Sequence, residues 1–232
     1  VGRGAGGDLT LRIDAEAERA IVSTLKSELG SFSILSEEMG FKRNGYPIMV
    51  IDPVDGSYNA ARGIPFYSVS IAASHGLTLD GVFIGVVHAP ELEETYLAVS
   101  GEGAYLNSSE LRARTVAWGE RAVSISSPRL ACRETAEAIG RLLCMGFKVR
   151  MLGSASLESC FVSSNRLDAY VDPWKRLRPF DIAAAYLIAR EAEAIVEVGS
   201  KEMGVGVRLE YLTATSREVL NTVKTALKLG YH

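Results

Sequence analysis

Features that mark several common protein classes are scarce or missing in this sequence of 232 residues. No apolar run approaches the ~20 residues that a helix needs to cross a bilayer. The three histidines stand too far apart in the chain for a local zinc motif. Lys and Arg are scattered and the net charge is −3, so the electrostatic footprint of a nucleic-acid-binding protein is lacking. We therefore expect neither a membrane nor a nucleic acid as a partner.

Cysteine is equally scarce. Cys132, Cys144 and Cys160 are odd in number and lack the spacing of metal ligands. The simplest interpretation is a set of free, mostly buried thiols in a reducing compartment. We therefore expect a cytoplasmic protein.

The sequence also has no internal repeat, no low-complexity segment and no obvious linker. Apolar residues make up 47% of the chain and charged residues 23%, as in an ordinary globular protein. The length allows a sizeable buried core. We expect a single domain over residues 1–232, with subdomains at about 1–118 and about 119–232 that share one core.

Hydrophobic periodicity in the first half of the chain predicts a helix followed by a mainly antiparallel sheet. The segment Asp14–Leu29 carries apolar residues at every fourth position and is followed by Gly30, as expected for an amphipathic helix. Short apolar runs bounded by turn residues then predict strands. These strands are Phe32–Leu35, Ile48–Ile51, Val69–Ala73 and Val82–His88, with a further β region over Tyr96–Tyr105.

Strands and helices alternate in the second half, which indicates an α/β layer. The predicted strands are Ala122–Ile125, Lys148–Met151, Ala169–Val171, Ala194–Val198 and Leu212–Ala214. The predicted helices are Arg133–Met145, Ser154–Ser164, Phe180–Glu193 and a last one in which Thr215 and Glu218 have the spacing of a capping box. The fold class is therefore α/β, with an α+β character in the first half.

The segment from Asp52 to Ser57, Asp-Pro-Val-Asp-Gly-Ser, carries the most chemical information. An apolar strand ends at Asp52, Pro53 fixes a turn, and Asp55 is aimed back toward Asp52. Gly56 and Ser57 can open a helix whose free N–H groups and dipole favour phosphate. Two carboxylates beside a phosphate would repel it unless hard cations intervene, and an all-oxygen ligand set selects Mg²⁺ over zinc or copper.

Each acidic position also has a simpler interpretation. Asp14 suits a helix N-cap, Glu37-Glu38 a solvated acidic pair, and Asp181 the first turn of a helix. The Asp-Pro-x-Asp-Gly run alone suits an ordinary turn. Their joint order favours a functional site. Since two like charges about 5 Å apart repel by roughly 3 kcal/mol at an effective dielectric constant of 20, a site of four or five carboxylates needs a cation.

Five segments resemble motifs of the inositol monophosphatase family. The residues from Asp52 to Asn59 resemble its Asp-Pro-(Ile/Val)-Asp-Gly-(Thr/Ser)-x-Asn signature. The resemblance runs from about Asp8 to the last helix, and it implies a layered αβαβα sandwich (the sugar-phosphatase fold) and a homodimer. The other matching segments are Asp8-Leu9-Thr10 followed by Asp14, Ser36-Glu37-Glu38, Gly153-Ser154-Ala155 and Phe180-Asp181-Ile182-Ala183-Ala184.

The resemblance further implies a site with two to three Mg²⁺ ions. Asp14 and Ser57 correspond to an Asp–Thr pair that relays a proton from the attacking water, and Gly56 and Ser57 would present backbone N–H groups to the phosphate. Glu37 counts among the catalytic residues as well, and Glu38 lies behind the ligands. The implied metal ligands are Glu37, Asp52, the carbonyl of Val54, Asp55 and Asp181.

Substrate contacts are also implied by the resemblance. Ser57 stands in place of the commoner Thr, and Phe180 in place of Trp. Asp172 stands where the eukaryotic inositol enzymes place a substrate-contacting Glu. The basic residues that follow it resemble those of archaeal members, which hydrolyse both inositol phosphate and fructose 1,6-bisphosphate. The implied substrate-binding residues are Asp55, Gly153, Ser154, Ala155, Asp172, Lys175, Arg176 and Arg178.

We thus predict a Mg²⁺-dependent phosphomonoesterase of a small sugar or polyol phosphate, acting on inositol monophosphate and fructose 1,6-bisphosphate. The acidic segments contain no Cys or His nucleophile, which favours direct attack by a metal-activated water. One alternative is a nucleotide 3′-phosphatase or NADP phosphatase on the same scaffold, which needs an adenine pocket. Another is a non-catalytic regulatory or RNA-associated protein. Lost metal ligands would indicate that class, whereas every ligand position here is filled.

Overall fold

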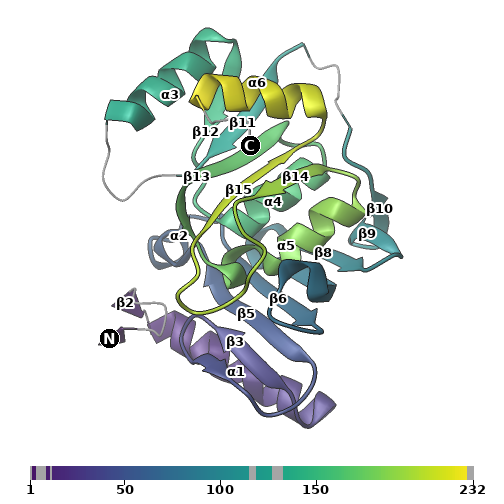
Figure 1. The fold of residues 1–232 in the computed structure, drawn as a ribbon. Helices are drawn as coiled ribbons and strands as arrows, with labels where there is room; N and C mark the ends of the chain where they lie inside the picture. The colour runs from purple at the N-terminus through teal and green to yellow at the C-terminus, as the bar shows by residue number, and fades with distance from the viewer. Residues whose placement is uncertain (1, 4–8, 11, 115–118, 127–132, 229–232) are drawn as a thin grey trace.

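The computed structural model describes residues 2–3, 9–10, 12–114, 119–126 and 133–228. Helices and sheets alternate in five layers, as Figure 1 shows. This arrangement confirms the predicted αβαβα sandwich. Asp8 and Cys132 lie outside the described residues. The helical layers are α1 (Arg12–Leu29) at one end, α4 (Ala155–Ser163) with α5 (Pro179–Glu191) in the middle, and α3 (Arg133–Cys144) with α6 (Arg217–Leu227) at the other end.

The first sheet has eight strands, and its neighbouring pairs are antiparallel except for β3 with β5. Alternate residues of β5 face opposite layers, as the period of a strand requires. Ile51 packs in one cluster with Val22 of α1, and Val50 packs in another with residues of α5. The strand order is β10 (Ser109–Leu111), β9 (Gly103–Leu106), β8 (Glu94–Val99), β7 (Val82–Ala89), β6 (Ser68–Ser74), β5 (Ile48–Asp55), β3 (Ser33–Ser36) and β4 (Gly40–Lys42).

The second sheet is mixed and is likewise covered on both faces. Val123 and Val171 pack with Leu142 of α3 and Leu220 of α6, whereas Tyr170 faces the middle layer. The two faces of the strands are therefore both apolar. The strand order is β12 (Phe147–Arg150), β11 (Arg121–Ile125), β13 (Ala169–Leu177), β15 (Leu209–Ala214) and β14 (Ile195–Val198).

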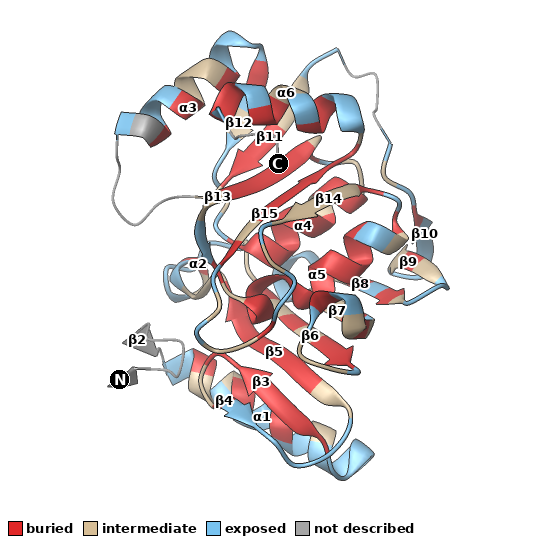
Figure 2. Ribbon diagram, viewed as in Figure 1, coloured by how far each residue is buried: buried red, intermediate tan, exposed pale blue. Residues whose placement is uncertain are grey.

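The middle helices are buried along most of their length (Figure 2). Every residue of α5 from Pro179 to Ala189 is buried. Gly85 of β7 shows how closely α5 sits on the first sheet, because a Cβ atom at Gly85 would lie only 2.7 Å from the carbonyl oxygen of Ala184. An apolar helix with sheets on both sides is thereby fixed in position, and its N-terminal end is fixed with it.

Short elements complete the described residues. The helix α2 (Ser57–Ala61) follows β5 directly. None of the helices in the described ranges is long and apolar enough to cross a membrane. The remaining elements are β1 (Gly2–Arg3) paired with β2 (Leu9–Thr10), and the 3₁₀ turns η1 (Leu79–Gly81) and η2 (Pro90–Leu92).

Two strands continue beyond their predicted ends. β5 continues through Pro53 to Asp55, because Asp55 pairs with Ser68 of β6 beyond an irregularity in the register. The expected turn back toward Asp52 is therefore wrong. In the same way, β13 continues past Asp172 through a register shift to pair Leu177 with Leu209.

The start of the last helix and one thiol also differ from expectation. The N-cap of α6 is Ser216, whose Oγ accepts a hydrogen bond from the backbone N–H of Val219 at 3.3 Å, so the predicted capping role of Thr215 is wrong. Cys160 is buried and free as expected, whereas Cys144 is free but exposed. The strands β4 and β10 were not predicted, because three residues are too few to show a period.

Candidate active site

Three buried carboxylates converge where β3, β5 and α5 meet. β3 and β5 are parallel neighbours with Ser36 opposite Ile51, so Glu37 and Asp52 emerge side by side. Asp181 comes from the first turn of α5, which packs against β5. Their residue exposures are 9%, 2% and 6%. Burial raises the pKa of Asp52 well above its usual range, and the charges of Glu37, Asp55 and Asp181 raise it further.

Arg178 lies among these carboxylates. Its Nη1 is 2.5 Å from Oε1 of Glu37 and its Nη2 is 3.2 Å from Oδ1 of Asp181. The guanidinium also lies 4.7 Å from the centre of the Phe180 ring. Burial alone would lower the pKa of Arg178, but the charges of Asp181, Glu37 and Asp52 outweigh it and raise that pKa. Arg178 is thus the cation that the structure places in this acidic cluster.

The pKa of Glu37 remains high in spite of this partner. Desolvation by burial is the main cause and raises it to about 7, against the lowering effect of Arg178. In the part of the chain that the structure describes, no three Asp, Glu, His or Cys side chains form a ready-made ion cage. The carboxylates are instead arrayed around the guanidinium. Burying the negative charge of this site costs free energy, and a bound cation would offset that cost.

Asp55 faces the other way, toward the start of α4. Its Oδ1 accepts a hydrogen bond from the N–H of Ala155 at 3.1 Å, and its Oδ2 accepts bonds from the Oγ of Ser154 and the N–H of Ser156, both at 2.7 Å. The hydroxyl of Ser156 donates to Oδ2 as well. Burial raises the pKa of Asp55, and these hydrogen bonds oppose the rise. Asp55 therefore joins the two halves of the chain at the site.

Ser57 links α1 to the end of β5. Its Oγ lies 2.9 Å from Oδ1 of Asp14 and 2.8 Å from the carbonyl oxygen of Val54. A hydroxyl has one proton, so it donates to one of these acceptors at a time. Asp14 is 3% exposed and lies in the first turn of α1. The structure thus brings together the two residues that the sequence pairs across 43 positions.

The turn before α2 is packed against the segment that precedes α4. Gly56 has φ +95°, a left-handed conformation that favours glycine, and a Cβ atom there would lie 3.0 Å from the carbonyl oxygen of Gly153. Asn59 of α2 donates from Nδ2 to the carbonyl oxygens of Phe66 and Leu152, at 2.7 Å each. These contacts place Gly56 and Asn59 beside Leu152 and Gly153.

One buried residue at this junction was missed by the sequence reasoning. Glu158, in the first turn of α4, is 1% exposed and accepts hydrogen bonds from three consecutive backbone N–H groups. Burial raises its pKa to about 7. The available signal was one carboxylate inside the apolar and small-residue run Ala155-Ser-Leu-Glu-Ser-Cys-Phe-Val. A buried acid requires hydrogen-bond donors, and here the backbone donors are local.

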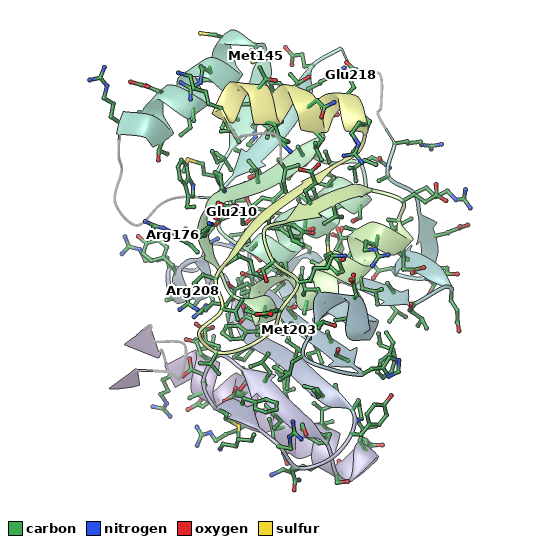
Figure 3. All side chains as sticks on the ribbon, in the orientation of Figure 1. Met145, Arg176, Met203, Arg208, Glu210 and Glu218 are labelled. Carbon is green, nitrogen blue, oxygen red and sulfur yellow. The ribbon has the colours of Figure 1, made fainter. Side chains whose placement is uncertain are left out.

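The three basic residues that follow Asp172 in the sequence do not form one cluster. Lys175 is exposed, with its Nζ 3.8 Å from Oε1 of Glu210, and Arg176 is exposed at the edge of the molecule, near Arg208 and Glu210 (Figure 3). Only Arg178 turns inward. Lys175 and Asp172 also line a groove of about 1040 Å³ over β13, β14 and β15.

The two remaining predicted residues lie close to the acidic cluster. Asp172 is 2% exposed and accepts a hydrogen bond from the N–H of Trp174 at 2.9 Å. Burial raises its pKa, and the charge of Asp181 contributes to that rise. Glu38 is half-buried, and its charge slightly raises the pKa of Glu37.

The chain is similar to known proteins in both sequence and fold. The model of the Inositol monophosphatase family matches residues 3–227. The chain is 35% identical over 189 residues to a fructose-1,6-bisphosphatase/inositol-1-monophosphatase of Thermotoga maritima, covering 82% of this chain and 71% of that protein. It is 33% identical over 228 residues to a fructose-1,6-bisphosphatase of Pyrococcus furiosus, covering 96% and 85%. A solved inositol monophosphatase-fructose 1,6 bisphosphatase superposes with a TM-score of 0.86 at 28% identity, over 97% and 88% of the two chains.

Proposed function

The chain belongs to the inositol monophosphatase family and is a phosphatase, and on that premise we propose that it hydrolyses inositol monophosphate and fructose 1,6-bisphosphate with Mg²⁺. The observation that carries this proposal is the set of buried carboxylates around one cation, beside a serine held against Asp14. The substrates named for the relatives of Thermotoga maritima and Pyrococcus furiosus support the substrate class.

The donor set suits a hard divalent cation. Phosphatases of this family are generally metal-dependent. All the side-chain donors are carboxylate oxygens, which prefer Mg²⁺ to softer metals. Burial and the charges of neighbouring carboxylates raise the pKa values of Glu37, Asp52 and Asp55, so added positive charge would stabilise the ionised cluster. We assign two to three Mg²⁺ ions to Glu37, Asp52, the carbonyl of Val54, Asp55 and Asp181.

When bound, Mg²⁺ supplies charge neutralisation for the phosphate and a lowered pKa for a water molecule. The chain moves the proton of that water. The Oγ of Ser57 accepts it while its own proton passes to Asp14, along the 2.9 Å hydrogen bond. Glu37 would complete the catalytic set by holding and orienting water at the metal site. Glu38 would position the ligand residues without binding a cation itself.

The phosphate and the alcohol are held by the junction between the two halves. The backbone N–H groups of Gly56 and Ser57 face the phosphate in this proposal. The segment Gly153-Ser154-Ala155, together with Asp55 and Asp172, contacts the hydroxyl groups of the substrate. The contacts between Gly56 and Gly153 support this arrangement because they keep the two surfaces at a fixed separation.

A second phosphate distinguishes fructose 1,6-bisphosphate from inositol monophosphate. Lys175 and Arg176 are exposed along β13 and are available to it, whereas Arg178 is engaged by Glu37 and Asp181. Replacing Lys175 and Arg176 by Ala should raise KM for the bisphosphate by about tenfold and leave inositol phosphate hydrolysis nearly unchanged. Equal losses on the two substrates would contradict this role.

Phosphate release from a panel of substrates tests the proposed function. The panel contains inositol monophosphate, fructose 1,6-bisphosphate, a nucleotide 3′-phosphate and NADP, each with Mg²⁺ and with chelator. We expect turnover of the first two, abolished by chelation. Preference for the nucleotides would establish the alternative phosphatases instead, and no turnover of any ester would indicate a non-catalytic or RNA-associated protein.

Assembly and location complete the proposal. We expect a homodimer, as the family resemblance implies, and a cytoplasmic location, as the free thiols suggest. Light scattering on the purified protein gives the mass in solution, and a mass of one chain would contradict the dimer.

A further inference from the structure

Five consecutive backbone N–H groups before and within the first turn of α4 all donate to two buried carboxylates. Those of Leu152, Gly153 and Ser154 donate to Glu158, at 3.1, 3.3 and 3.2 Å. Those of Ala155 and Ser156 donate to Asp55, at 3.1 and 2.7 Å. One carboxylate comes from the helix itself and the other from β5, about 100 residues earlier in the chain.

The two carboxylates are connected through this short segment. Glu158 fixes the backbone from Leu152 to Ser154, and that backbone sets where the next two N–H groups point. Asp55 receives those two N–H groups, so the direction of its carboxylate depends on the segment that Glu158 holds. The hydroxyl of Ser124 also donates to Glu158 and ties it to β11.

The same segment supports the proposed phosphate site. The carbonyl oxygen of Leu152 accepts a hydrogen bond from Asn59 of α2, and the carbonyl oxygen of Gly153 lies against Gly56. A shift of residues 152–154 would therefore reach both Asp55 and the start of α2. Among the described residues, Glu158 forms no hydrogen bond to either: its hydrogen-bond partners are Ser124 and the three N–H groups.

We propose that Glu158 is a positioning residue of the phosphatase site, which holds residues 152–154 so that Asp55 and the turn at Gly56 keep their orientation. This inference rests on the proposed function, in which Asp55 binds Mg²⁺ and Gly56 binds phosphate. Since Glu158 is 1% exposed, removing its carboxylate would leave three N–H groups buried without an acceptor. The segment would then rearrange to reach water, and Asp55 would lose its fixed partners.

The test compares Glu158→Gln with Ser124→Ala in the full chain. The amide keeps the size of Glu158 but turns an NH₂ group toward N–H donors, whereas Ser124→Ala removes one donor and leaves every backbone N–H paired. We expect Glu158→Gln to weaken Mg²⁺ binding, measured by calorimetry, about tenfold and to lower kcat by about the same factor. Ser124→Ala should stay within about twofold of wild type in both.

Amide hydrogen exchange in the metal-free protein gives a readout independent of catalysis. Exchange at residues 152–156 should accelerate in Glu158→Gln while that of β5 and β6 stays slow. A variant with a lower Tm but unchanged Mg²⁺ affinity and kcat would overturn the proposal, because a purely structural role predicts that result. If Glu158→Gln does not fold, Glu158→Asp replaces it, and wild-type kcat in that variant overturns the proposal equally.

Phosphate release by the wild-type protein distinguishes a failure of this inference from a failure of the proposed function on which it rests. Absence of Mg²⁺-dependent phosphate release in wild type would overturn the proposed function. Wild-type release that Glu158→Gln leaves intact would overturn only the role of Glu158.

Discussion

Arg178 Nη1 lies 2.5 Å from Glu37 Oε1, inside a cluster that also contains Asp52 and Asp181. This ion pair is buried, with side-chain exposures of 12% and 11%. Breaking a buried pair by removing one partner leaves an uncompensated charge, which destabilises a protein by about 3–5 kcal/mol. The guanidinium therefore stabilises the same carboxylates that we assign to Mg²⁺.

The first prediction follows from that pair. Arg178→Gln should lower the Tm of the protein in chelator, because three carboxylates lose their cation. Saturating Mg²⁺ should then raise the Tm by more than it does in wild type, since the ions replace the missing charge. Thermal unfolding with and without Mg²⁺ measures both effects, and Arg176→Gln, which changes an exposed residue of the preceding strand β13, is the control. An equal Mg²⁺-induced shift in Arg178→Gln and wild type would contradict this account.

A second prediction separates metal ligands from their neighbours. Asp52→Asn should lower kcat by several orders of magnitude, because the amide keeps the shape of Asp52 but loses the charge that we assign to Mg²⁺ binding. Glu38→Gln should have a much smaller effect, because Glu38 is half-buried and stands behind the ligands. Steady-state kinetics at saturating Mg²⁺ makes the comparison. Equal losses in the two variants would show that the assignment within the acidic segments is wrong.

The third prediction concerns the proton relay. Ser57→Ala removes the hydroxyl that lies 2.9 Å from Asp14, so kcat should fall by ~10²–10⁴-fold while Mg²⁺ still binds. Single-turnover kinetics and Mg²⁺ calorimetry provide the two readouts. Ser57→Thr keeps the hydroxyl and should retain most of the activity. Normal kcat with lost Mg²⁺ affinity in Ser57→Ala would assign Ser57 to the metal instead of the relay.

A fourth prediction uses the raised carboxyl pKa values. Glu37 has a pKa of about 7 in the folded chain against an ordinary value of 4.5, so between these pH values the folded state holds a proton that the unfolded state has lost. The free energy of unfolding in chelator should therefore fall as pH rises from about 4.5 to about 7, by at most about 1.4 kcal/mol per pH unit for each such group.

The effect of Mg²⁺ in this experiment distinguishes the titration of the proposed metal ligands from that of other buried acids. Glu158 also has a raised pKa and adds to the same trend, but it is not an assigned ligand. Mg²⁺ competes with protons only at its ligands, so the Mg²⁺-induced rise in Tm should grow from pH 5.5 to pH 8. Thermal scans in chelator and in Mg²⁺ across this range are the measurement. A Mg²⁺ effect that shrinks as pH rises would refute the assignment of Glu37.

The sequence predicted the layers and the acidic segments because both are local patterns. Alternating strand and helix periods indicated the α/β class, the family resemblance implied the five-layered sandwich, and the run from Asp52 to Asn59 indicated which strand end carries the chemistry. The division near residues 118 and 119 stays a prediction. The direction of Asp55 was not accessible, because its partners on α4 lie about 100 residues away and no local spacing indicates them.

Arg178 shows a second limit. Its sequence neighbours Lys175 and Arg176 suggested a common basic surface, but the register shift in β13 and the start of α5 turn Arg178 inward. All three residues are basic and lie close together in the sequence, so neither charge nor spacing distinguishes Arg178 from Lys175 and Arg176. Arg178 follows the last residue of β13 and is the N-cap of α5, so the start of the helix decides where it lies.

The residues of the site come from distant parts of the chain, and this determines at which stage of folding the site forms. Asp14, Glu37, Asp52, Asp55 and Asp181 come from α1, the end of β3, β5 and α5, so the site exists only after contacts of long sequence separation have closed. Such contacts form late in folding, because the entropy of closing the long loops is lost before the contacts contribute favourable free energy. Interactions absent from the folding transition state act mainly on the unfolding rate. Cations bound at this site should therefore lengthen the lifetime of the native state and leave its rate of formation almost unchanged.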